Sequence, residues 1–141
     1  MKTAWIVLAI ISGLGLICCS GVFFTGLQVY RDIRGIQAGA RGFVLANFEQ
    51  DVKTWDPSGW QDKSEATKFE TYKTHLGQLL NHGPWSIRGT TFSGPRDHAI
   101  ATTTLTSKAT FARGNGLVTY TVLCQNGAYR RGSLLIEPTK N

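Results

Sequence analysis

The apolar and polar positions divide the chain into a long apolar start and a mixed remainder. From Ala4 to Leu27 the sequence reads AWIVLAIISGLGLICCSGVFFTGL and carries no charged side chain over these 24 positions. A helix needs roughly 20 apolar residues to cross a bilayer. The pattern therefore predicts a transmembrane anchor over residues 1–28, followed by one domain over residues 29–141.

Two other interpretations of the apolar start stay open. A cleaved secretory signal would use Lys2 as its basic region and would be cut near Cys18–Ser20, but the apolar run continues through Phe24, beyond a usual signal core. A lipid-modified cysteine in the same stretch is the second alternative, although the preceding Leu16–Ile17 departs from the small residue that a bacterial lipoprotein signal prefers. The length of the run favours an uncleaved anchor.

The basic residues that flank the anchor bear on its orientation. Lys2 precedes the anchor, whereas Arg31, Arg34 and Arg41 follow it. The excess of positive charge on the second side would place that side in the cytoplasm. The short start is instead typical of a signal-anchor whose N-terminus stays inside. We favour the second interpretation and expect a single-pass protein of a bacterial inner membrane with an extracytoplasmic domain.

The region after the anchor has the period of a helix. Its apolar residues recur every three or four positions, at Ile33, Ile36, Ala40, Phe43, Ala46 or Asn47, and Val52. Gly35 and Gly39 are four residues apart and share one face. Small residues at this spacing are found where helices contact each other. These two glycines are therefore candidate helix-contact positions.

A second helix is expected after the loop DPSGW, residues 56–60. Asp62 followed by Glu65 has the form of a capping box, which marks a helix start. The expected apolar face of this helix consists of Phe69, Tyr72, Leu76, Leu79 and Leu80. The sequence NHGP, residues 81–84, is expected to end it.

The last part of the chain is typical of antiparallel strands. Three or four strands are expected from the ranges 85–92, 98–111, 117–124 and 128–137. The sequence ARGNG, residues 112–116, is expected to be a hairpin loop, and Asn126–Gly127 suits a type I′ turn. Two amphipathic helices would cover one face of this curled sheet. The expected fold class is therefore α+β.

Charge and composition exclude one class of partner. The domain holds 14 of the 15 basic residues and all 9 acidic ones, which are scattered along it, and Arg130–Arg131 is the only adjacent basic pair. Nucleic-acid binding would need a denser basic face with interleaved aromatic residues. The charges suit a solvated strand surface, or contact with anionic lipid headgroups or an acidic partner.

Residue types that carry out chemistry do not form a recognisable site. His75, His82 and His98 lack the spacing of metal ligands, and no Ser or Cys lies in a nucleophile motif. Cys124 is the one cysteine of the domain and is expected to be a core residue. We therefore expect no catalytic residue, no cofactor and no metal, and a protein that is not an enzyme.

A candidate partner surface follows from two tryptophans and the arginine pair. Trp55 and Trp60 flank the turn at Asp56–Pro57. Exposed tryptophan and arginine side chains are enriched at protein interfaces. The same tryptophans would also fill a gap between helices and sheet, and this alternative is slightly favoured.

The region from Phe69 to Pro138 resembles a known superfamily through three segments. These are LGQLL at the helix end, ATFARGNGLVTYTVLCQNG as a strand–loop–strand–turn unit, and YRRGSLLIEP as the closing strand. They are similar to membrane-tethered proteins of the nuclear-transport-factor-like superfamily, in which a Trp often stands where this chain has Tyr129. The resemblance covers about half the chain. The small domain of inner-membrane assembly factors for respiratory oxidases is a second resemblance.

The first resemblance implies a cone-shaped α+β fold. Its interior would be faced by Phe69, Tyr72, Trp85, Tyr120 and Val122, and it would be packed or would hold a small apolar ligand. Fold implies function only weakly. The expected role is an accessory, assembly or scaffolding subunit of a larger membrane complex. The alternatives are a membrane-anchored module that binds a small apolar ligand, and a pilin-like structural subunit.

Overall fold

The computed structural model describes residues 31–54, 56–62, 66–95 and 98–140. The chain divides into two compact units, Met1–Gly35 and Ile36–Asn141. The predicted anchor and Trp55 lie outside the described residues. Within the described ranges, no helix is long and apolar enough to cross a membrane.

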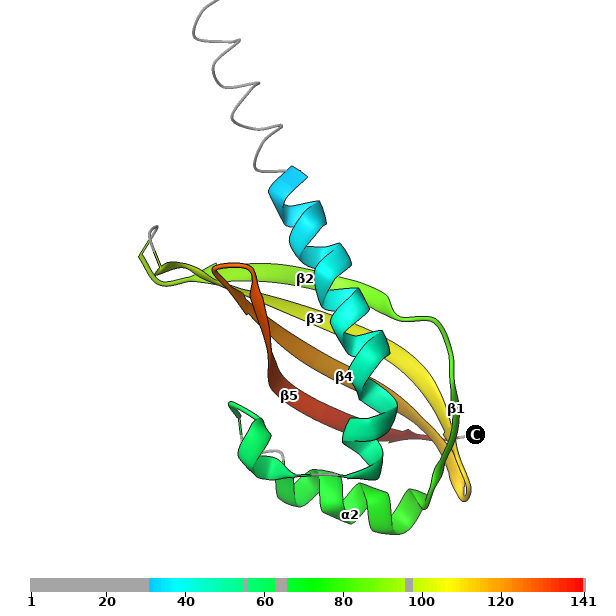
Figure 1. The fold of residues 1–141 in the computed structure, drawn as a ribbon. Coiled ribbons are helices and arrows are strands. Elements are labelled where there is room, and N and C mark those ends of the chain that lie inside the picture. Colours follow the sequence, from blue (N-terminus) through cyan, green and yellow to red (C-terminus); the bar gives the residue numbers. More distant parts are fainter. Residues whose placement is uncertain (1–30, 55, 63–65, 96–97, 141) are drawn as a thin grey trace, which may run out of the picture. The chain divides into compact units, whose positions relative to one another are not determined.

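The second unit combines helices with one antiparallel sheet (Figure 1). Residues 31–53 are helical, and they are followed by the 3-10 helix η1 (Pro57–Gly59) and the helix α2 (Ala66–Leu76). The strands are β1 (Leu79–His82), β2 (Ser86–Ser93), β3 (Ile100–Phe111), β4 (Gly114–Gln125) and β5 (Ala128–Thr139). The sheet order is β1-β3-β4-β5, and β2 also pairs with β3. The predicted α+β class is confirmed, but the sheet has five strands instead of three or four.

The additional strand comes from residues that we predicted to be helical. Gly77 ends α2 with a φ of 75°, and its N–H donates to the Lys73 carbonyl at 2.9 Å. A glycine in this conformation is a common helix terminus. Leu79 then pairs with Phe111, and β1 begins there. The helical spacing of Leu79 and Leu80 is therefore overridden by pairing with a distant strand.

The predicted turn at the last hairpin is confirmed. Asn126 and Gly127 have φ values of 52° and 77°, as both central residues of a type I′ turn require. The preceding hairpin is tighter than we predicted, because Gly114 already pairs with Phe111. Its turn therefore consists of Ala112 and Arg113.

A bulge changes the alternation of side chains along β5. Ser133 pairs with Thr121 but Arg131 pairs with Val122, so Gly132 is the extra residue. Before the bulge the odd-numbered Tyr129 and Arg131 point to the helix side, and after it the even-numbered Leu134 and Ile136 do. A Cβ on Gly132 would lie 2.9 Å from the Thr121 carbonyl oxygen. The bulge thus requires glycine, and it directs Arg131 inward.

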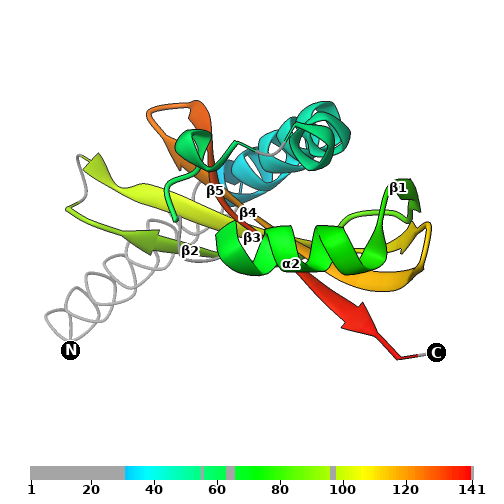
Figure 2. The ribbon, with the colours of Figure 1, turned by 90° about the horizontal axis from the view of Figure 1, so that it is seen from below.

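One face of the sheet carries the core. Residues 36–53 cross this face as a helix, whereas the opposite face has no described element over it (Figure 2). The helix contributes Ala40, Val44, Phe48 and Val52, and α2 contributes Phe69 and Leu76. The strands add Leu105, Ala109, Phe111, Val118, Tyr120, Val122, Leu134 and Ile136. All of these side chains belong to one buried cluster.

Candidate functional site

A buried acid lies at the centre of the core. Asp51 is 7% exposed and projects from the helix that crosses the sheet. Tyr120 Oη donates to its Oδ2 at 2.5 Å, and Arg131 Nε donates to its Oδ1 at 2.9 Å. Arg131 Nη2 also donates to Asn47 Oδ1 at 3.1 Å. Both carboxylate oxygens of Asp51 are therefore occupied by protein donors.

The electrostatics of this network favour a fixed arrangement. The charge of Asp51 is balanced by Arg131, as a buried carboxylate requires. Burial, and next the hydrogen bond to Asp51, raise the pKa of Tyr120 far above its ordinary value. Tyr120 consequently remains a neutral donor. An acid whose oxygens are both engaged, beside a phenol that does not ionise, is poorly suited to proton transfer.

Aromatic rings fill the space around the network. The ring centroids of Phe48 and Trp85 are 4.9 Å apart, and those of Trp60 and Tyr120 are 5.2 Å apart. Of the interior residues expected from the resemblance, Phe69, Trp85, Tyr120 and Val122 are buried, and Tyr72 packs partly buried against the same cluster. The interior is therefore packed with side chains.

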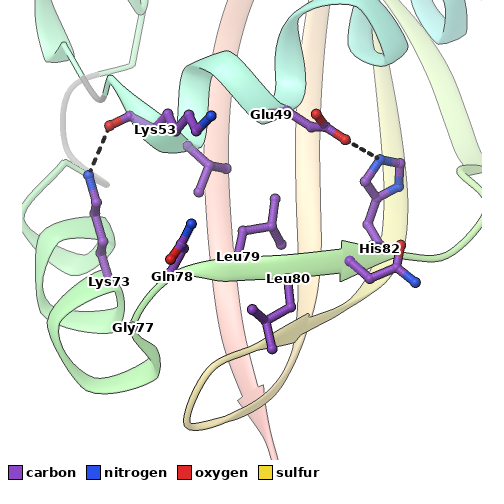
Figure 3. A pocket seen from close by; sticks show the side chains of 10 residues that line it. Glu49, Lys53, Lys73, Gly77, Gln78, Leu79, Leu80 and His82 are labelled. Atoms are coloured by element: carbon purple, nitrogen blue, oxygen red, sulfur yellow. Dashed lines mark hydrogen bonds and ion pairs between the residues drawn. The ribbon is translucent and has the colours of Figure 1, made fainter.

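One hollow lies between the end of the first helix, α2 and β1 (Figure 3). Its volume is about 500 Å³, and it is lined by Glu49, Val52, Lys53, Lys73, Gly77, Gln78, Leu79, Leu80, Asn81 and His82. His82 Nδ1 donates to the Gly83 carbonyl at 2.9 Å, and its Nε2 lies 3.9 Å from Glu49 Oε1. Lys73 Nζ donates to the Lys53 carbonyl at 3.3 Å. The described lining of this hollow holds one carboxylate, Glu49, and two ammonium groups, Lys53 and Lys73.

A second hollow brings together most of the predicted partner surface. Its volume is about 350 Å³, and it is lined by Phe43, Ser58, Gly59, Trp60, Gln61, Tyr129, Arg130 and Arg131. Trp60, Arg130 and Arg131 thus lie around one depression. Trp60 is only 4% exposed and packs on the core, so it forms a wall instead of a protruding contact. We call this depression the arginine hollow.

The two candidate helix-contact glycines have different surroundings. A Cβ on Gly39 would overlap the hydroxyl end of the Tyr129 side chain. Gly39 therefore gives room for a contact between the helix and β5 within the same chain. An added Cβ on Gly35, which belongs to the first unit, would meet nothing within 4 Å.

The sequence also held a signal for Asp51 that our prediction did not use. Asp51 continues the buried series of Ala40, Val44 and Phe48 on one helical face. A lone acid on an apolar stripe indicates a buried, paired charge. Among the residues that the structure describes, no three His, Cys, Asp or Glu side chains gather as metal ligands would.

The uncovered side of the sheet has a distinct composition. Side chains that alternate with the core positions are half-buried there: Thr102, Thr104, Thr119, Thr121, Leu123, Ser133 and Leu135. None of these seven is charged. The charged residues Lys108, Arg130 and Glu137 lie on the same strands and on the same side of the sheet, at the edges of this group. We call the seven uncharged residues the outer face.

Comparisons with known proteins give no assignment. No protein-family model, no curated protein and no solved structure matches this chain.

Proposed function

We propose that this chain is a single-pass membrane protein whose α+β domain is a non-enzymatic accessory, assembly or scaffolding subunit of a larger membrane complex. The observation that carries the proposal is the outer face. It spans three adjacent strands, no described element covers it, and its seven uncharged residues are bordered by the charged Lys108, Arg130 and Glu137 on the same side of the sheet. Depletion of charge is a feature of the cores of protein interfaces. A partner that docks on this face would complete the second layer of the sheet.

The packed interior of the domain supports a scaffolding role more than a role in binding a small ligand. A small-molecule site usually has a cavity lined by apolar side chains with a few placed polar groups. Here Phe48, Trp60 and Trp85 occupy that region, and the polar groups of Asp51 and Tyr120 bond to each other. The same saturation of Asp51 supports a role without catalysis.

The proposal also includes the location of the domain relative to the membrane. The uncharged run from Ala4 to Leu27 would anchor it, and the domain would lie on the extracytoplasmic side of a bacterial inner membrane. The resemblance to membrane-tethered proteins of the nuclear-transport-factor-like superfamily is consistent with one anchor followed by a helix-covered curled sheet.

The test is gentle detergent extraction of the native protein, followed by native sizing and mass spectrometry of what migrates with it. We expect stoichiometric co-migration with a larger complex. Thr119→Lys places a charge at the centre of the outer face and should release the chain from the complex. Thr110→Lys is the matched control, because Thr110 is an exposed residue at the end of the same sheet and should leave the complex intact.

Two results would contradict the proposal in different ways. Migration of the wild-type protein as a small species would reject the subunit role. Retention of Thr119→Lys in the complex, with an unchanged circular dichroism spectrum, would show that the partner docks elsewhere.

A further inference from the structure

The arginine hollow differs from the larger hollow, whose lining includes the carboxylate of Glu49. Among the residues that the structure describes, its lining contains Arg130 and Arg131 and no acidic side chain. Asp51 lies behind Arg131 in the core, where the Tyr120 hydroxyl and the Arg131 Nε already occupy its oxygens. The guanidinium of Arg131 is therefore the charged group that lies between Asp51 and the hollow.

Hydrogen bonds within the protein fix the guanidinium of Arg131 but use only some of its N–H donors. Asp51 and Asn47 accept from Nε and Nη2, and Nη1 has no acceptor among the residues that the structure describes. The side chain is 33% exposed, so the remaining donors are accessible from the hollow. A guanidinium presents its donors as a planar fork that matches a carboxylate. Fixing the fork in advance lowers the entropic cost of binding.

Aromatic side chains form part of the wall of the hollow, beside the polar Ser58 and Gln61. The Phe43 ring lies beneath the guanidinium, with its centroid 5.8 Å from Arg131 Cζ, and Trp60 closes another side. The loop after η1 is tied to β5, since the Gln61 N–H donates to the Arg131 carbonyl at 3.3 Å. A charge pair enclosed by apolar walls is stronger than one in open water. The site is thus formed before anything binds.

We propose that the arginine hollow binds the carboxylate of an acidic side chain on a partner protein, with Arg131 as the fork. The inference rests on the proposed function, because the partner would be another subunit of the complex. The aromatic part of the wall, formed by Phe43, Trp60 and Tyr129, favours a glutamate or aspartate flanked by aliphatic side chains over a strongly hydrated anion.

The test uses the purified full-length chain in detergent at low ionic strength. Two fluorescent synthetic peptides serve as probes, one with a glutamate between leucines and one with glutamine in its place. Anisotropy should show that the glutamate peptide binds about tenfold more tightly. Gly59→Glu places a carboxylate at the rim, where an added Cβ meets nothing within 4 Å, and should abolish this preference. Gly59→Gln is the control of equal size and should retain it.

The outcomes separate the site from the subunit role. No preference for glutamate in the wild-type chain, or an undiminished preference in Gly59→Glu, would overturn the inference and leave Arg131 as the counter-ion of Asp51 alone. A preference that Gly59→Glu removes, in a chain that nonetheless migrates alone after native extraction, would support the carboxylate site and reject its assignment to a subunit contact. Co-migration with a larger complex, without any preference for the glutamate peptide, would support the subunit role and reject the carboxylate site.

Discussion

At the scale of single residues, the Asp51–Tyr120–Arg131 network joins the helix to two strands of the sheet. Tyr120 and Arg131 lie 69 and 80 positions after Asp51 in the sequence. A hydrogen bond to a buried charge contributes more than one between neutral groups, about 1.5–3 kcal/mol. The network therefore fixes how the helix sits on β4 and β5.

Tyr120 should make stability sensitive to alkaline pH. The pKa of its hydroxyl is raised in the folded state above the ordinary value of 10.0. Its contribution is fully present below pH 10 and is lost as the pH rises above that value, since the unfolded state then releases a proton that the folded state keeps. Urea unfolding of the wild-type protein between pH 9 and 11 should show a falling free energy of unfolding.

The variant Tyr120→Phe isolates this effect. We expect it to cost about 1.5–3 kcal/mol at neutral pH, because Asp51 loses a donor. Its free energy of unfolding should fall less steeply above pH 10 than that of the wild-type protein. Tyr72→Phe is the control, since Tyr72 is not part of the network. An equal alkaline slope in both variants would contradict a raised pKa for Tyr120.

Residue-level prediction from the sequence succeeded for apolar positions and missed the polar network. The burial of Phe69, Trp85 and Tyr120 follows from their place in alternating or helical patterns. The pairing of Asp51 with Arg131 does not, because it joins residues 80 positions apart and depends on a bulge. We predicted that Arg131 belongs to a surface pair with Arg130, yet its side chain reaches Asp51 in the core.

At the scale of elements, the bulge at Gly132 decides which side chains of β5 enter the core. The alternation in YRRGSLLIEP changes phase between Arg131 and Leu134, and a single unpaired residue accounts for the change. This signal is present in the sequence, since glycine inside a strand is typical of a bulge. Because Gly132 follows Arg131 directly on the strand, the bulge determines the direction of the Arg131 side chain.

Substitution of this glycine should be costly. In Gly132→Ala the new Cβ would lie 2.9 Å from the Thr121 carbonyl oxygen, so β4 or β5 must shift. We expect a loss of about 1–3 kcal/mol in the free energy of urea unfolding. Gly89→Ala in β2 is the matched control, because its Cβ meets nothing within 4 Å, and it should be neutral or slightly stabilising. Equal stability of the two variants would argue against a close approach at the bulge.

The elements that we predicted correctly are those whose formation depends on residues close together in the sequence. The Asn126–Gly127 turn depends on residues that tolerate positive φ, and the long strands follow from their Thr and Val content. Strand β1 escaped prediction because it is only four residues long and because its pairing partner, β3, lies about 30 positions further along the chain. Helical spacing and strand pairing competed for Leu79, and a non-local contact decided the result.

At the scale of the whole molecule, every described residue of the buried cluster belongs to the unit Ile36–Asn141. A fragment of residues 36–141 should therefore fold without the rest of the chain and stay soluble without detergent. Its urea unfolding, followed by circular dichroism and tryptophan fluorescence, should give one cooperative transition with coincident midpoints. A gradual transition, or different midpoints for the two probes, would show that the core needs residues before Ile36.

The loop that follows η1 has a consequence for self-association. Strand β5 is the last strand of the sheet order, and such a strand presents unpaired backbone groups to which another chain can add. Here the N–H groups of Gln61 and Asp62 occupy the carbonyls of Arg131 and Gly132, and Pro138 offers no N–H further along. Growth of the sheet into a multi-chain aggregate is thereby obstructed at this edge.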